Sequence, residues 1–115
     1  MPLLKLQTSA SLTDVQKQTL LTSLSQTVAQ IIGKPEQYVM VTVESVPMIM
    51  SGQVQDAAFV ELRSIGGIGG AVNRQLSKAL CEQLNASLGI DPVRIYLNFM
   101  DVPAADWGYN GSTFG

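Results

Sequence analysis

The chain has 115 residues, of which 46% are hydrophobic and 14% are charged, and its formal net charge is −2. This size and composition predict one compact domain with a packed core and argue against disorder. The chain has no histidine and one cysteine, which excludes an intrachain disulfide, a zinc site built from Cys and His, and any histidine-dependent catalytic triad.

Charge and hydropathy also limit the partners of this chain. The sequence has no run of basic residues, which argues against nucleic acid, and no apolar stretch reaches the length of a membrane span. The first residues lack the charged-then-apolar pattern of a secretory signal. We therefore expect a cytoplasmic protein, with export by a non-classical route left open.

The first predicted element is a strand in the segment MPLLKLQTSA, which has a proline at its second position. Proline lacks an amide hydrogen and is tolerated at the first residue of a strand, so Pro2 has a purely structural explanation. It also has a chemical one. If Met1 is removed, Pro2 becomes a chain-terminal secondary amine, which is one of the few general bases available without histidine.

The next element is a helix from about Thr13 to Gly33, and Pro35 prevents its continuation. Lys34 directly follows this helix. Its ordinary role is to interact with the negative end of the helix dipole. Its functional role would be to disfavour the protonated form of Pro2 and to bind a substrate carboxylate.

The chain contains an internal repeat, because shifting the sequence by 56 residues places the pattern of the first half on that of the second. The second half therefore predicts another strand and a helix from about Gly69 to Leu88. The second strands of the two halves are YVMVTVESV and VRIYLNFMDV, both rich in β-branched and aromatic residues.

Two strand–helix–strand repeats, at roughly 2–50 and 57–105 and followed by a C-terminal tail, predict a single α/β domain over residues 1–115. The expected architecture is a two-layer sandwich with a four-stranded sheet, two helices on one face, and short extra strands. The outer strands look apolar on both sides, so we expect an apolar free face that further copies of the chain cover in a homo-oligomer. Three copies that enclose their sheets are one such arrangement.

A glycine-rich segment, SIGGIGG at residues 64–70, separates the third strand from the second helix. These glycines either form a tight turn or bring backbone amides close to an anion. Their spacing fits neither the dinucleotide-binding fingerprint nor the phosphate-binding loop.

Further candidate ligand-binding residues lie in the last strand and in the tail. Tyr96 and Asn98 alternate on one strand and so face the same side, and an asparagine in an apolar strand needs hydrogen-bond partners, which a ligand can supply. Trp107, Tyr109 and Phe114 either wall an apolar pocket or pack between subunits.

Taken together, these residues make the chain resemble the tautomerase superfamily, in particular the branch that contains macrophage migration inhibitory factor and dopachrome tautomerase. The resemblance covers essentially the whole chain. It is carried by Pro2 and by the ordered motifs Gly33-Lys34-Pro35-x-Gln37-Tyr38, Ser64-Ile65-Gly66-x-Ile68-Gly69-Gly70-x-x-Asn73-Arg74, Tyr96-x-Asn98 and Asn110-x-Ser112-Thr113-Phe114.

The resemblance implies a homotrimer with active sites between subunits. It also implies cofactor-free and metal-free keto–enol tautomerisation of phenylpyruvate-type or dopachrome-type substrates, with a small aromatic 2-keto acid as the expected ligand. Carried over by position, Pro2 would transfer the proton, Lys34 would bind the substrate carboxylate, and the backbone amide of Ile65 would add a contact. The remaining implied substrate-binding residues are Leu3, Trp107, Tyr109 and Phe114 in the pocket wall, and Tyr96 and Asn98 from the adjacent subunit.

The chain departs from the family pattern at several positions. Ala57 and Val60 stand where the vertebrate cytokine has a Cys-x-x-Cys pair, so no thiol–disulfide chemistry is expected. Gly67 replaces a lysine at the pocket rim, Tyr109 replaces a tryptophan, and Trp107 replaces a small aliphatic residue, so the pocket mouth is altered.

Two other functions stay open. One is a cytokine-like, receptor-binding protein with a weak or vestigial tautomerase site, although the sequence shows no receptor motif. The other is an enzyme of the same fold that uses Pro2 for hydration or dehalogenation. Such relatives usually carry extra charged groups beside the proline, and Lys34 is the only one apparent in the sequence.

Overall fold

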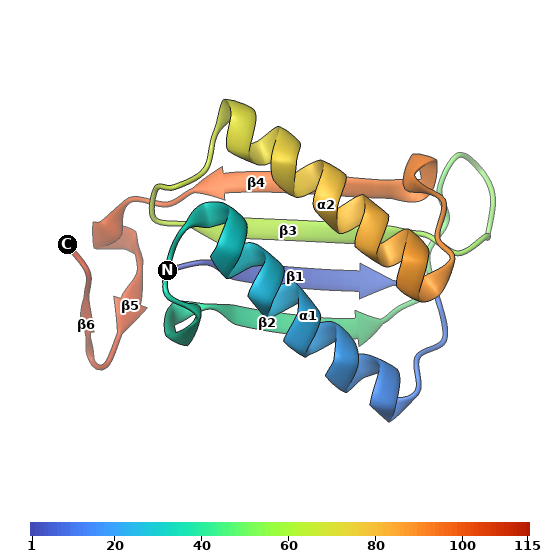
Figure 1. Ribbon diagram of the computed structural model, residues 1–115, viewed down its shortest axis with the longest axis horizontal. Coiled ribbons are helices and arrows are strands. Elements are labelled where there is room, and N and C mark those ends of the chain that lie inside the picture. Colours follow the sequence, from blue (N-terminus) through green and yellow to red (C-terminus); the bar gives the residue numbers. More distant parts are fainter.

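The computed structural model describes residues 1–115 as one mixed sheet with two helices packed on one of its faces (Figure 1). The sheet has the strand order β2-β1-β3-β4, with β1 and β3 antiparallel in the centre and each outer strand parallel to its neighbour. The predicted two-layer α/β sandwich of two strand–helix–strand repeats is confirmed. The main elements are β1 (Leu3–Thr8), α1 (Asp14–Ile32), β2 (Met40–Ser45), β3 (Ala58–Ser64), α2 (Gly70–Leu88) and β4 (Ile95–Asp101).

Short elements complete the chain. Three short 3₁₀ turns lie at η1 (Glu36–Tyr38), η2 (Pro92–Arg94) and η3 (Ala104–Asp106). The tail forms a small antiparallel hairpin of β5 (Gly108–Tyr109) and β6 (Ser112–Thr113), which lies beyond the end of the main sheet where the chain begins (Figure 1). Neither long helix is apolar enough along its length to cross a membrane.

The predicted helix limits are confirmed, and each has a local cause. The Thr13 hydroxyl accepts a hydrogen bond from the Gln16 amide at 3.1 Å, and the Gln16 side chain accepts one from the Thr13 amide at 2.8 Å, which satisfies two otherwise free donors. Gly33 and Gly89 end the two helices with φ of +77° and +68°. These left-handed conformations favour glycine because a Cβ would be strained there.

The 56-residue repeat is visible as a pseudo-twofold axis through the middle of the molecule. In the central strand pair, Lys5 lies opposite Glu61. Between the helices, the Thr27 hydroxyl donates to the Gln83 side chain at 3.0 Å, again across 56 positions. A residue can contact its own repeat equivalent only on such an axis, so the two halves are related by a rotation about it.

The core lies between the helices and the inner face of the sheet. Its members alternate along each strand and recur every three or four residues along each helix, as the spacing predicts. The helical members are Leu20, Leu24, Val28, Leu76, Leu80 and Leu84, and the strand members include Leu4, Leu6, Val60 and Leu62. Each of these large side chains contributes about 2 kcal/mol on burial, so this layer supplies most of the stability.

The prediction of an apolar free face is wrong. The valines of β2 and the apolar residues Leu97 and Phe99 of β4 all turn toward the helices, because strand side chains alternate with a period of two. The opposite face carries a mixed set in which apolar side chains alternate with polar and charged ones. That set is Leu3, Lys5, Gln7, Met40, Thr42, Glu44, Phe59, Glu61, Arg63, Tyr96, Asn98 and Met100.

One buried arginine, which the sequence analysis did not single out, holds the loop between β2 and β3. The Arg94 guanidinium donates hydrogen bonds to the carbonyl oxygens of Met50, Gln53, Gln55 and Asp56 at 3.0–3.1 Å. Arg94 is 8% exposed, so these bonds replace most of its hydration. The loop is thereby ordered at the end of the sheet opposite the chain start.

We predict that Arg94→Met lowers the free energy of unfolding by about 3 kcal/mol, because four carbonyls lose a charged donor at once. Urea unfolding at equal protein concentration measures the change. Arg74→Met is the matched control, since Arg74 is exposed on α2 and makes no salt bridge. A change below about 0.5 kcal/mol in Arg94→Met would show that the loop needs no clamp.

Candidate active site

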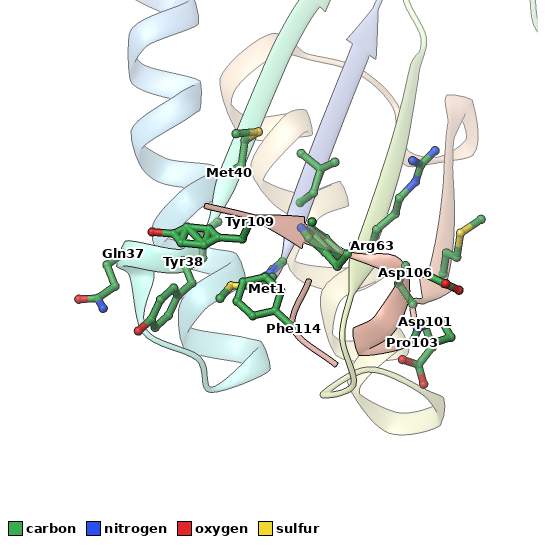
Figure 2. A pocket seen from close by; sticks show the side chains of 17 residues that line it. Met1, Gln37, Tyr38, Met40, Arg63, Asp101, Pro103, Asp106, Tyr109 and Phe114 are labelled. Carbon is green, nitrogen blue, oxygen red and sulfur yellow. The ribbon is translucent and has the colours of Figure 1, made fainter. Parts of the chain in front are cut away.

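A cavity of about 930 Å³ lies at the end of the sheet where β1 begins and β4 ends (Figure 2). The chain start, the η1 turn and the C-terminal hairpin enclose it. Most of its lining is apolar, with a few charged and polar side chains among the aromatic and aliphatic ones. The lining residues include Met1, Pro2, Leu3, Tyr38, Met40, Arg63, Met100, Asp101, Asp106, Trp107, Tyr109 and Phe114.

Pro2 sits at the buried base of this cavity and is less than 2% exposed. Its carbonyl accepts a hydrogen bond from the Met40 amide at 3.0 Å, which starts the pairing of β1 with β2. Proline has no amide hydrogen to leave unsatisfied at this strand start, so the residue is buried at no hydrogen-bonding cost. The structural and the chemical explanations of Pro2 are therefore compatible.

The chain-terminal amine lies in surroundings that disfavour its charged form. The pKa of the Met1 amine is lowered from 8.0 to about 6, first by burial and then by the charge and hydrogen-bonding contact of Lys34. Both causes act against the ammonium form, which loses hydration and meets a like charge. Above pH 6 the amine is therefore mostly neutral and able to accept a proton.

Lys34 is held by one hydrogen bond of its backbone and one of its side-chain amino group. Its backbone amide donates to the Ala29 carbonyl at 3.2 Å in the last turn of α1, and its Nζ donates to the carbonyl oxygen of Ile65. A Cβ on Gly67 would stand 3.2 Å from the Lys34 Cε and 2.9 Å from Ile32. Glycine at position 67 therefore leaves room for the Lys34 side chain to reach the Ile65 carbonyl.

Asp101, at the end of β4, fixes the turn that holds Lys34. One carboxylate oxygen of Asp101 accepts a hydrogen bond from the Gly66 amide at 2.9 Å, and the Val102 amide donates to the Ser64 carbonyl at 2.9 Å. The sequence analysis missed Asp101. Its only signal was an acidic residue at the end of a strand, and the partner Gly66 is 35 positions away.

The aromatic residues of the tail form one wall of the cavity. The Phe114 amide donates to the Trp107 carbonyl at 3.2 Å, and the rings of Tyr109 and Phe114 stack with centroids 5.4 Å apart and planes 14° apart. Leu3 lies opposite on the sheet and also lines the cavity. The structure therefore brings five of the predicted residues together here: Pro2, Leu3, Trp107, Tyr109 and Phe114.

Comparison with known proteins identifies the family. The family model described as macrophage migration inhibitory factor (MIF) matches residues 1–115. The macrophage migration inhibitory factor of Meriones unguiculatus is 51% identical over 98 residues, which cover 83% of this chain and 84% of that protein. This chain belongs to the MIF family.

Other relatives extend this result. A homologue from Trichinella spiralis is 39% identical over 115 residues, which cover 99% of this chain and 100% of that protein. The crystal structure of the Prochlorococcus marinus homologue matches with a TM-score of 0.94 at 41% identity, over 98% of this chain and 99% of that chain. The resemblance to the MIF branch and its fold is confirmed.

Two residues that the MIF resemblance assigns to the site do not reach the cavity of their own chain. Tyr96 and Asn98 lie exposed on the free face of β4 and are absent from the cavity lining. Tyr96 is four residues from Met100, the nearest lining residue on that strand, or about 13 Å along it. Lys34 and Ile65 are also absent from the lining, but Lys34 contacts the terminal amine at the cavity and donates to the Ile65 carbonyl.

No group of three or more histidine, cysteine, aspartate or glutamate side chains is gathered anywhere in the chain, so the structure offers no cluster of metal ligands. The acidic groups at the cavity are Asp101, which is hydrogen-bonded to Gly66, and Asp106, which is exposed. The basic groups at the site are the terminal amine, Lys34 beside it and Arg63 in the lining, within a mostly apolar wall.

We predict that Asp101→Ala raises the pKa of the chain-terminal amine above that of Asp101→Asn. Both variants lose one negative charge, but only Asn keeps an oxygen that accepts the Gly66 hydrogen bond, so only Ala releases the turn that holds Lys34. NMR titration of the amine measures both values. Equal pKa values in the two variants would show that Asp101 does not position Lys34.

Proposed function

We propose that this protein is a cofactor-free tautomerase that interconverts the keto and enol forms of phenylpyruvate-type substrates, with Pro2 as the base. The observation that carries the proposal is the burial of Pro2 in an aromatic-walled cavity, where the adjoining amine of Met1 has its pKa lowered to about 6 by burial and by Lys34. Membership of the MIF family is consistent with such an activity.

The first requirement is a free nitrogen on Pro2. Removal of Met1, which a small second residue permits, leaves that nitrogen as a secondary amine at the buried base of the cavity. A secondary amine starts with a higher pKa than a primary one. Pro2 is more deeply buried than Met1, and the burial and the Lys34 charge that lower the pKa of the Met1 amine would act against protonation of the Pro2 nitrogen as well.

The reaction is a proton relay through this nitrogen. Neutral Pro2 takes a proton from the carbon next to the keto group, so a C–H bond breaks and an N–H bond forms. Lys34 has three N–H donors and gives one to Ile65, so it keeps donors for the substrate carboxylate and for the negative charge of the enolate. The Pro2 ammonium then returns the proton to the enolate oxygen, which yields the enol.

We predict that Pro2→Gly lowers kcat/KM for phenylpyruvate ketonisation by about 10²-fold, because the secondary amine that acts as general base is replaced by a primary one. Glycine is as small as the enzyme that removes Met1 requires, so the chain end stays free. Pro92→Gly in the η2 turn, outside the cavity, is the matched control. Equal rates in wild type and Pro2→Gly, or full activity in protein that mass spectrometry shows to retain Met1, would overturn the proposal.

The second requirement is a neighbouring subunit. Tyr96 and Asn98 lie further along β4, outside the lining of the cavity of their own chain, so we assign them to the cavity of another copy. The exposed side chains of Tyr96, Met40 and Met100 on the same face also favour contact with another subunit. We therefore propose a homotrimer in which each cavity is completed by Tyr96 and Asn98 of the adjacent subunit.

Mixing two impaired variants tests this arrangement. Pro2→Gly replaces the secondary amine by a primary one and Tyr96→Ala removes the ring contact, so each homo-oligomer is impaired. Subunits exchanged between the two then recombine intact halves in roughly a quarter of the sites, and activity rises accordingly. No gain after verified subunit exchange would mean that each site draws both residues from one chain.

A second candidate function is supported by the 51% identity to a protein named macrophage migration inhibitory factor. In that case the protein acts through binding by its folded surface, and proton transfer is not required for its function. A macrophage migration assay with the Pro2→Gly protein separates the two candidates. Inhibition that survives the loss of the base would favour the cytokine-like function.

A further inference from the structure

Arg63 is a second cation at the cavity, and the sequence analysis did not identify it. It lies near the end of β3, directly opposite Leu3 of β1 and beside Met100 of β4, and both of these neighbours line the cavity with it. Figure 2 shows Arg63 extending from β3 beside the start of β1. Among the lining residues it is the only one with a positively charged side chain.

The guanidinium of Arg63 is free to bind a ligand. It makes no hydrogen bond within the chain, and its one ionic contact is a long one, 3.9 Å from Nη2 to a Glu61 oxygen. Glu61 also lies 3.6 Å from Lys5, so its charge is shared between two cations. The side chain of Arg63 is 40% exposed, and an exposed ion pair of this kind is weak.

Arg63 and Lys34 lie on different sides of the terminal amine. Lys34 comes from the end of α1 in the helix layer, whereas Arg63 projects on the free face of the sheet. Lys34 lowers the pKa of the Met1 amine by its charge and its hydrogen-bonding contact. We therefore assign the carboxylate next to a keto group to Lys34, which leaves Arg63 for a second anionic group.

The two carboxylates at the cavity limit where a second anionic group of a ligand can bind. Asp101 and Asp106 both come from the segment that follows β4, and both repel negative charge. An anionic group that is held away from Lys34 therefore finds a favourable partner only at Arg63. The guanidinium can hold a carboxylate through two parallel hydrogen bonds.

We propose that Arg63 forms an anion-binding subsite, so that the preferred substrates are 2-keto acids with a second negatively charged group at the end remote from the keto acid. The conversion of these compounds as substrates rests on the proposed function, whereas the binding of an anionic group by Arg63 does not. A ring carboxylate para to the reacting side chain is the simplest group of this kind.

Binding of unreactive ligands tests the subsite without reference to catalysis. Calorimetry compares cinnamate with 4-carboxycinnamate, which differ by one carboxylate and have no keto group. We expect the wild type to bind the dicarboxylate about tenfold more tightly, Arg63→Gln to lose this preference, and Arg63→Lys to keep part of it. Arg74→Gln, which removes an exposed arginine outside the cavity, is the matched control and keeps the full preference.

Kinetics then link the subsite to turnover. For 4-carboxyphenylpyruvate we expect Arg63→Gln to raise KM about tenfold, while KM for phenylpyruvate changes less than about twofold and kcat for both substrates is kept. Equal binding of the two cinnamates by wild type, or a preference that survives in Arg63→Gln, overturns the subsite. Discrimination between the cinnamates without turnover of either keto acid overturns the proposed function and leaves the subsite standing.

Discussion

The antiparallel pairing of β1 with β3 is the constraint on which the site depends. This pairing puts Leu3, next to the start of the chain, opposite Arg63, next to the end of β3. The glycine-rich turn that follows β3 therefore lies beside the chain start, although more than sixty positions separate them in sequence. A slip of one residue in this register would turn the apolar side chains of β1 to the wrong face, so the hydrophobic core enforces it.

Where the chain start meets this turn, the protein keeps the terminal amine neutral by excluding water and placing a like charge beside it. The lysine that supplies the charge is itself tied to a backbone carbonyl, and that carbonyl belongs to a turn tied to Asp101. Each link is a hydrogen bond between segments that are distant in sequence. The pKa of the terminal amine therefore depends on the packing of three separate segments, and not on the residue alone.

Local signals were sufficient to predict most of the fold. Thr13 and Gly33 mark the limits of the first helix through short-range hydrogen bonds and backbone preference, so the sequence alone located them. The polar character of the free face was missed because the outer strands contain enough valines and aromatics to look apolar on both sides. Arg94 and Asp101 were missed because their partners are loop carbonyls and amides far along the chain, which no sequence pattern marks.

The pseudo-twofold axis does not repeat the groups at the start of the chain in the second half of the molecule. The position equivalent to Pro2 in the second half is Ala58, and the position equivalent to Lys34 is Ile90, both of them buried and apolar. Ala58 is joined to residues on both sides, so its nitrogen is an amide and has no basicity. The repeat therefore doubles the architecture of the fold, but only the first half has an amine next to a lysine at this position.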